Sequence, residues 1–366
     1  MSKAWTTLLV VAVAAACAGT ARYYYRKRPP PTKSGLLDLI GNTPMVLIQS
    51  ASKETGCRIY AKCEFLNPCG SSKDRICKAI LLHAVEHNLL QSGGTVIEAS
   101  SGSTGISLTR IAISMGFQCL IVLPSDIARE KSQLIETLGG KTQLVLPSSI
   151  VNPNHFVNVA KQLASNGKQT NTLFVNQFEN ELNFACHAET TGREIWDQVP
   201  NVDVFVASAG TAGTIGGVSK HLKERNPNIV TVLADCQGSS LCSKVNHDVM
   251  YTAQQSERTL KRHRILETIC EGIGLDRMTG NLALALPYID RAVRIEDVDV
   301  VKYSRQLLLE DGMFVGSSSA LNLAAAVQVA KQLGPGHTIV TIFPSSGERE
   351  SSKLFSDDFC RARGLL

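Results

Sequence analysis

The sequence predicts an α/β protein with two mostly parallel sheets. From residue 35 onward, short apolar runs alternate with amphipathic segments of helical periodicity, which is typical of parallel strands covered by helices on both faces. About 330 residues follow this pattern, more than one sheet usually takes. We therefore expect an N-terminal α/β domain over residues 35–180 and a C-terminal α/β domain over residues 181–366, after a separate segment at residues 1–34.

The individual elements follow from the local pattern. Runs rich in β-branched and other apolar residues predict strands at residues 58–64, 95–98, 118–123, 143–146, 173–175, 202–207, 229–235 and 338–343. The segments between them predict helices at residues 72–88, 105–115, 128–138, 184–196, 215–225, 296–310 and 320–333. Parallel sheets bind ligands beyond the carboxyl ends of their strands, so we expect the chemistry in the loops that follow these strands.

The first 34 residues differ in kind from the rest of the chain. Residues 4–21 contain no charge and would form a helix about 27 Å long, near the lower limit for crossing a bilayer. Three tyrosines and the basic run at residues 26–28 follow, as they do beside membrane anchors. This pattern predicts an N-terminal transmembrane helix at residues 4–21, with the body of the protein facing the cytosol.

Several membranes are open as the destination of this segment. Its alanine-rich, moderate hydrophobicity and its basic flank resemble anchors of the mitochondrial outer membrane, so we expect a single-pass protein of that membrane. A cleaved secretory signal would carry its main charge before the apolar run, and a matrix presequence would be amphipathic and rich in arginine. The mitochondrial matrix and the ER membrane are the alternative locations.

Charge and cysteine content argue against some partners. The chain has 37 Lys and Arg and 32 Asp and Glu, but residues 1–33 hold six of the basic residues and no acidic one, which leaves 31 basic and 32 acidic residues in the body. Aromatic residues make up only 5% of the chain, so neither charge nor stacking surface favours a nucleic-acid partner. The 11 cysteines form no CxxC pair and no zinc-like cluster, so we expect no metal site and mostly buried thiols.

Four loops between strands and helices carry residues suited to chemistry. Residues 67–75 (NPCGSSKDR) place Lys73 in the first turn of a helix. A lysine there is usually a solvated surface residue, but the helix dipole disfavours a cation, which favours a covalently used or anion-paired lysine more than usual. Residues 100–105 (SSGSTG) and 316–320 (GSSSA) open helices with hydroxyls that suit a bound anion or act as ordinary caps. Residues 208–214 (SAGTAGT) lack the lysine of a nucleoside-triphosphate loop and the spacing of a dinucleotide loop, and favour a single phosphate.

Together these motifs resemble one family. A lysine in NPxGSxKDR, an SGxTG loop, a GTxGT loop and a late GxSS loop occur in this order in the cysteine synthase/cystathionine β-synthase family, whose members are pyridoxal-phosphate enzymes of fold type II. The resemblance covers about residues 36–356 and includes LIGNTP (39–44), NQFEN (176–180), TTGREIW (190–196) and PSSGER (344–349). It implies two parallel-sheet α/β domains with the cofactor at their interface. The N-terminal segment makes the chain similar to a fungal, membrane-anchored mitochondrial branch of this family.

The resemblance also implies roles for single residues. Lys73 would be the catalytic residue, forming a Schiff base with pyridoxal 5'-phosphate and then removing the substrate Cα proton. Residues 210–214 would hold the cofactor phosphate, and Ser318 would hydrogen-bond the pyridine nitrogen. The expected cofactor-binding residues are Lys73, Ser103, Gly210, Thr211, Ala212, Gly213, Thr214 and Ser318. The residues expected to grip the substrate carboxylate are Ser100, Ser101, Thr104 and Gln177.

The chain departs from the family pattern at several of these loops. Ser103 stands where the family has an asparagine beside the cofactor's O3′, and Ala212 stands where it has a glycine near the phosphate. The GISSGA and GIGxG motifs of the family read GSSSAL at residues 316–321 and GIGLD at residues 272–276. Because Lys73 and the carboxylate-binding residues are retained, we expect cofactor binding and α,β-elimination to persist, whereas the leaving group and the nucleophile are open.

The leading hypothesis is a cysteine synthase (O-acetylserine sulfhydrylase) that acts in cysteine biosynthesis. Such a transferase converts O-acetyl-L-serine and sulfide to L-cysteine and acetate by way of an α-aminoacrylate. The alternatives are a cysteine desulfhydrase or related β-eliminating lyase, a cystathionine-forming or dehydratase activity, and a membrane-tethered scaffold that binds the cofactor without catalysis. The resemblance alone implies a homodimer.

Overall fold

The computed structural model describes residues 32–100, 102–126, 129–166, 171–251 and 268–366. The chain divides into two compact units, residues 1–38 and residues 39–366. In the first unit the Ser34 hydroxyl donates a hydrogen bond to the Asp38 carboxylate. A short 3-10 helix, η1 (Leu36–Leu39), begins there, and all other described elements belong to the second unit.

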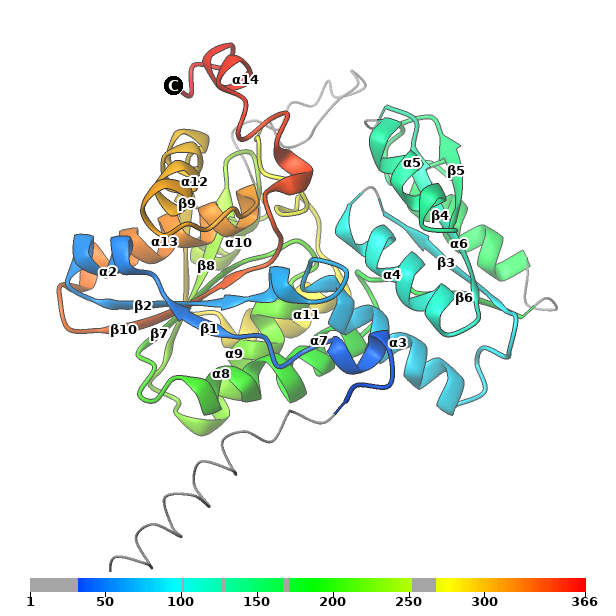
Figure 1. Ribbon diagram of the computed structural model, residues 1–366, viewed down its shortest axis with the longest axis horizontal. Helices are drawn as coiled ribbons and strands as arrows, with labels where there is room; N and C mark the ends of the chain where they lie inside the picture. The colour runs from blue at the N-terminus through cyan, green and yellow to red at the C-terminus, as the bar shows by residue number, and fades with distance from the viewer. Residues whose placement is uncertain (1–31, 101, 127–128, 167–170, 252–267) are drawn as a thin grey trace, which may run out of the picture. The chain divides into compact units, whose positions relative to one another are not determined.

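The larger sheet has six strands in the order β1-β2-β10-β7-β8-β9 (Figure 1). Strand β1 pairs with β2 in antiparallel fashion, and every other pair in this sheet is parallel. The strands are β1 (Met45–Leu47), β2 (Arg58–Cys63), β7 (Val204–Ser208), β8 (Val230–Cys236), β9 (Arg291–Ile295) and β10 (Thr338–Phe343). Because the central strands are parallel, their carboxyl ends lie at one edge of the sheet.

Alternating side chains of this sheet enter two separate cores. Val204 and Val206 of β7 pack into one core, and Phe205 and Ala207 of the same strand pack into the other. This alternation is the period of two expected of a strand that is buried on both faces. The helices that contribute to the first core are α2 (Gln49–Thr55), α12 (Asp297–Glu310), α13 (Ser317–Leu333) and α14 (Asp357–Arg361). Those that contribute to the second are α8 (Arg193–Gln198), α9 (Gly213–Arg225), α10 (Leu241–His247) and α11 (Gly280–Ala285).

The smaller sheet has four parallel strands in the order β5-β4-β3-β6. Its strands are β3 (Thr95–Ala99), β4 (Gln118–Pro124), β5 (Lys141–Val145) and β6 (Thr172–Phe174). Helix α6 (Phe156–Asn166) packs into one core with β3 and β4, while α4 (Ser103–Ser114) contacts β3, β4 and helix α3 (Lys73–Glu86). We call the six-stranded sheet and its helices the large lobe, and the four-stranded sheet with α4, α5 and α6 the small lobe.

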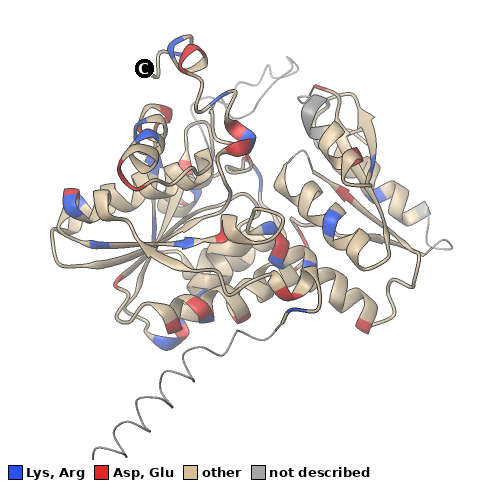
Figure 2. Ribbon diagram, viewed as in Figure 1, with Lys and Arg blue, Asp and Glu red and all other residues tan. Residues whose placement is uncertain are grey.

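The remaining elements connect the sheets. The other helices are α3 (Lys73–Glu86), α4 (Ser103–Ser114), α5 (Arg129–Thr137), α6 (Phe156–Asn166), α7 (Leu182–Cys186), α10 (Leu241–His247) and α14 (Asp357–Arg361). The shorter turns of helix are η2 (Glu64–Leu66), the π-helix η3 (His187–Gly192), η4 (Leu286–Tyr288) and η5 (Glu348–Glu350). Figure 2 shows acidic and basic segments adjoining one another near α3.

Strands β1 and β2 precede β3 in the chain but pair in the sheet of later strands, so the chain passes from the large lobe to the small lobe and back.

The predicted α/β architecture of fold type II is confirmed, but the transmembrane helix in that prediction is corrected. Among the described residues no helix is long and apolar enough to cross a bilayer. The longest of them, α13, has 17 residues, fewer than the ~20 that a span requires. The predicted span at residues 4–21 lies outside the described residues, and no helix that the structure describes supports a transmembrane segment.

Candidate active site

A cavity of about 860 Å³ lies where loops from the two lobes meet. It is lined by Lys73 after β2, Ser100 after β3, Gly210 after β7 and Pro344 after β10. All four positions follow the carboxyl ends of parallel strands. The cavity therefore lies where α/β sheets generally bind ligands.

Most of the residues predicted from the sequence meet in this cavity. Those that line it are Lys73, Ser100, Ser103, Thr104, Gln177, Gly210, Thr211, Ala212, Thr214 and Ser318. Gly213 is not among the lining residues, because its α-carbon faces the side chain of Asn183. Ser101 lies outside the described residues.

Lys73 is the first residue of α3 and reaches into the cavity. Its side chain makes no hydrogen bond and no ion pair with any residue that the structure describes. Burial lowers the pKa of the Lys73 amine below its usual value, and the positive end of the helix dipole also disfavours a cation there. The uncharged amine is the form that attacks a carbonyl, so this position suits a nucleophilic lysine.

The loop at residues 210–214 packs so closely against its neighbours that it requires glycine at two positions. A Cβ on Gly210 would lie 2.1 Å from the Gly272 carbonyl oxygen, and one on Gly213 would lie 2.1 Å from Asn183 Oδ1. Ala212 takes a left-handed conformation with φ of 68° and leads directly into α9. The first N–H groups of a helix have no partner within it, so the loop presents donors to an anion at the positive end of the α9 dipole. These residues fit the phosphate of pyridoxal 5'-phosphate.

A second polar region lies at the start of α4. The Thr104 hydroxyl donates to Gln177 Oε1 at 2.7 Å, and Gln177 Nε2 lies 3.4 Å from Glu98 Oε1. Ser100 Oγ accepts from the backbone N–H groups of Gly102 and Gly105. Burial raises the pKa of Glu98 to about 7. Hydroxyl groups and an amide at a helix N-terminus suit a carboxylate ligand.

Several polar residues in and beside the cavity were not singled out from the sequence, and two of them join parts of the site. Asn322 lines the cavity one turn after Ser318 on α13; its Oδ1 accepts from Ser208 N–H and its Nδ2 donates to the Ile342 carbonyl, both at 2.7 Å. The i, i+4 spacing from Ser318 is the only sequence signal that pointed to it. It joins the ends of β7 and β10.

Arg349 was also missed, although its motif was noted. Its Nη1 donates to Ser103 Oγ at 3.1 Å, and its Nη2 donates to the Cys69 carbonyl at 2.7 Å. Arg349 therefore ties the start of α4 to the loop before Lys73.

The site can be compared with known proteins. Residues 36–345 match the family described as "Pyridoxal-phosphate dependent enzyme". The chain belongs to this family. The resemblance read from the loops is thus confirmed, and the cofactor of this pyridoxal-phosphate dependent enzyme is the one expected from it.

Individual relatives agree with this assignment. The enzyme is 46% identical over 341 residues to "Cysteine synthase 2" of Schizosaccharomyces pombe, a match that covers 91% of this chain and 86% of that protein. It is 45% identical to the "Putative mitochondrial cysteine synthase" of Saccharomyces cerevisiae, with 89% of this chain and 84% of that one covered. The solved structure "Crystal structure of O-ureido-L-serine synthase" superposes with a TM-score of 0.77 at 28% identity, and covers 91% of this chain and 100% of that chain.

Proposed function

We propose that this enzyme is a cysteine synthase that converts O-acetyl-L-serine and sulfide to L-cysteine and acetate. The observation that carries the proposal is the amine of Lys73, which has no partner among the described residues and shares one cavity with the N-termini of helices α4 and α9. A carboxylate and a phosphate on either side of a nucleophilic amine match an amino-acid substrate and a pyridoxal-phosphate cofactor. The names of the two yeast relatives support the same reaction.

The proposed roles divide between the two predicted domains. When bound, pyridoxal 5'-phosphate supplies an electron sink for the charge left at the substrate Cα. Residues 210–214 and Ser318, from the domain over 181–366, hold its phosphate and its pyridine nitrogen. The neutral hydroxyl of Ser318 cannot stabilise a full positive charge on that nitrogen as a carboxylate would, which favours loss of the β-substituent over longer-lived carbanion chemistry.

The domain over residues 35–180 handles the substrate in this proposal. Lys73 Nζ would hold the cofactor and accept the Cα proton, a role that the lowered pKa of its amine favours. Ser103 takes the position beside the cofactor ring. The residues that bind the substrate carboxylate are Ser100, Ser101, Thr104 and Gln177. The Gln177 amide has to exchange its contacts with Glu98 and Thr104 to serve a substrate, so we expect this region to move when substrate binds.

We also infer that the protein forms a homodimer and acts in mitochondria. The dimer rests on the family resemblance, and the location rests on the name of the Saccharomyces cerevisiae relative. Sedimentation of the purified protein tests the dimer, and a monomer at micromolar concentration would contradict it. Cell fractionation of the tagged full-length chain tests the location, which recovery outside the mitochondrial fraction would contradict.

The reaction is tested with the full-length protein and its products. Holoenzyme given O-acetyl-L-serine and sulfide should release cysteine and acetate, identified by mass. Lys73→Ala should lower this rate at least ~1000-fold because both roles of the amine are lost. Lys53→Ala, at an exposed lysine of α2, is the matched control and should be unchanged. Pyruvate and ammonia from cysteine alone, without cysteine synthesis, would point to the desulfhydrase; no turnover by a cofactor-loaded protein would point to the scaffold.

A further inference from the structure

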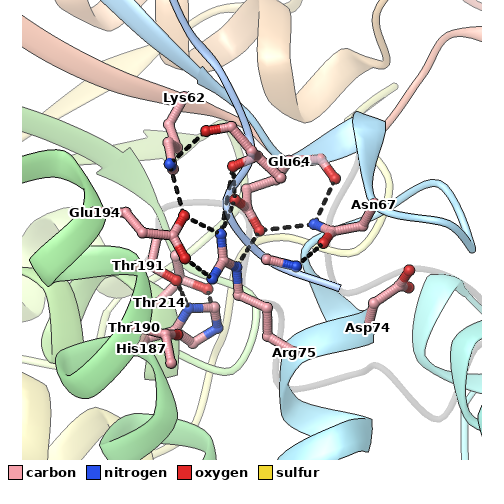
Figure 3. A network of polar contacts seen from close by, with 12 residues as sticks. Lys62, Glu64, Asn67, Asp74, Arg75, His187, Thr190, Thr191, Glu194 and Thr214 are labelled. Atoms are coloured by element: carbon pink, nitrogen blue, oxygen red, sulfur yellow. Dashed lines mark hydrogen bonds and ion pairs between the residues drawn. The ribbon is translucent and has the colours of Figure 1, made fainter. Parts of the chain in front are cut away.

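His187 lies directly behind the phosphate loop. Its Nε2 is 3.0 Å from Thr214 Oγ1, and its Nδ1 is 2.9 Å from Thr191 Oγ1 (Figure 3). Thr214 lines the cavity, whereas His187 does not and is only 1% exposed. The hydrogen bond to Thr214 is therefore the contact through which the imidazole reaches the cavity wall.

The contact depends on close packing between α9 and the π-helix η3. A Cβ on Gly217 would lie 2.3 Å from the Phe184 carbonyl oxygen and 2.9 Å from His187 Cβ. Only glycine lets the two segments approach this closely. Short π-helical turns of this kind are frequent at functional sites.

Burial and the nearby cations Arg75 and Lys73 keep the His187 ring neutral, while Glu64 and Glu194 oppose them. Arg75, Glu64, Lys73 and Glu194 all act on it, and Arg75 is held in place by the two glutamates (Figure 3). Burial and the Arg75 guanidinium lower the pKa of His187 to about 3. Near neutral pH the ring therefore has one N–H donor and one lone pair.

The hydrogen bonds decide which nitrogen carries the proton. Thr191 is fully buried, and its hydroxyl makes no other hydrogen bond with a described residue. A proton on Nδ1 would leave the Thr191 O–H without an acceptor and would force the Thr214 O–H to point at Nε2. A proton on Nε2 satisfies every group: Thr191 donates to Nδ1, Nε2 donates to Thr214, and the Thr214 proton is free to enter the cavity. A buried hydroxyl without a partner costs about 1–3 kcal/mol, so the second arrangement is favoured.

We propose that His187 is a positioning residue that fixes Thr214 as a hydrogen-bond donor to the cofactor phosphate. A phosphate dianion only accepts hydrogen bonds, so a threonine hydroxyl that points away from it would present a lone pair and weaken binding. This relay, in which Thr191 donates to His187 and His187 donates to Thr214, keeps the Thr214 hydroxyl in its donating orientation before the cofactor binds. This inference rests on the proposed role of residues 210–214 in holding the phosphate.

Two adjacent threonines of η3 provide a matched test. Thr191→Val removes the donor to Nδ1 at nearly constant volume, and Thr191→Ser restores it. Thr190→Val is the control, because the Thr190 hydroxyl donates to the Cys186 carbonyl and does not contact His187. Rebinding of pyridoxal 5'-phosphate to full-length apoprotein should weaken about tenfold in Thr191→Val, as loss of one oriented bond to a charged acceptor predicts, and should stay within about twofold in Thr191→Ser and Thr190→Val.

The tautomer is measured directly by ¹⁵N NMR of histidine-labelled protein, with the His187 signals assigned by their loss in His187→Asn. Protonated Nε2 and unprotonated Nδ1 are expected, and the reverse would overturn the proposal. Thr214→Val separates this proposal from the function it rests on. If Thr214→Val weakens cofactor binding but Thr191→Val does not, the relay is wrong and the phosphate loop stands. If Thr214→Val changes nothing, both are wrong.

Discussion

Glu194 gives the most direct test of the buried charges beside α3. Its Oε1 accepts from Arg75 Nη1 at 2.7 Å, and its Oε2 accepts from Arg75 Nη2 and lies 2.7 Å from Lys62 Nζ (Figure 3). The Lys62 side chain is fully buried and that of Arg75 is 3% exposed. Glu64 binds the other side of the same guanidinium. Glu194→Gln therefore removes one of the two carboxylates that neutralise two buried cations.

The size of the effect follows from the pKa of Glu194. Burial alone would raise it, but hydrogen bonds and charge attraction from Arg75 and Lys62 outweigh burial and lower it from 4.5 to about 2. At about 1.4 kcal/mol for each pKa unit, the folded state gains about 3 kcal/mol from this carboxylate at neutral pH. Removing one partner of a buried ion pair costs about 3–5 kcal/mol, which agrees.

Denaturant unfolding at pH 7 measures this loss. Glu194→Gln should lower the free energy of unfolding by about 3 kcal/mol, whereas Glu189→Gln, at an exposed carboxylate of η3, should change it by less than ~0.5 kcal/mol. Because the folded pKa is the lower one, the contribution of Glu194 is present above pH 4.5 and is lost as the pH falls toward 2. The variant should therefore lack this part of the acid-induced loss. A change below ~1 kcal/mol at pH 7, or an acid limb identical to that of the parent, would refute the reasoning.

Three further outcomes are expected. Ala212→Gly should raise the free energy of unfolding by about 1 kcal/mol, because Ala212 has φ of 68° where only glycine is unstrained; an unchanged denaturation midpoint would contradict this. Arg349→Met should raise the KM for O-acetyl-L-serine about tenfold with a smaller change in kcat, since two donors that hold the start of α4 are lost; initial rates decide, and an equal loss in kcat would count against it. Glu98→Gln should flatten the dependence of folding stability on pH between pH 4.5 and 7. Burial raises the pKa of Glu98 to about 7, so the stability of the parent protein falls as the pH rises through that interval. Unfolding is measured at pH 5 and pH 7, and the same pH dependence in variant and parent would mean that Glu98 titrates normally.

The regular part of the fold was predictable because its signals are local. The apolar run at residues 202–207 predicted β7 (Val204–Ser208), and the helical periodicity at residues 215–225 predicted α9 within two residues. Strand β1 was missed, although the equally short β6 was predicted at residues 173–175. The segment 184–196 was expected as one helix but contains the π-helix η3 in its middle. That turn depends on packing against Gly217 of α9, which no periodicity within the segment reports.

The candidate site also contains residues that local motifs predict and residues that depend on contacts between distant parts of the chain. Lys73 and residues 210–214 stand in contiguous motifs, so the resemblance of these motifs to one family was enough to propose them as site residues. Asn322, Arg349 and His187 contribute through partners that are distant in sequence: Asn322 bonds Ser208, 114 residues away, and Arg349 bonds Ser103, 246 residues away. Asn322 and Arg349 acquire their roles only when the strand ends and loops come together in the folded protein. Such contacts carry no local pattern.

The buried charges explain how the two predicted halves of the site are held in register. Lys73 and Arg75 are two positions apart on α3, so they point about 200° apart around the helix, one into the cavity and the other into the large lobe. An apolar core of the same volume would be at least as stable as a buried ion cluster, so stability alone does not account for it. Arg75 instead receives two carboxylates in fixed directions, Glu64 from η2 and Glu194 from α8. A planar guanidinium held on two sides permits only one orientation of α3 about its axis. That orientation sets the direction in which Lys73 points.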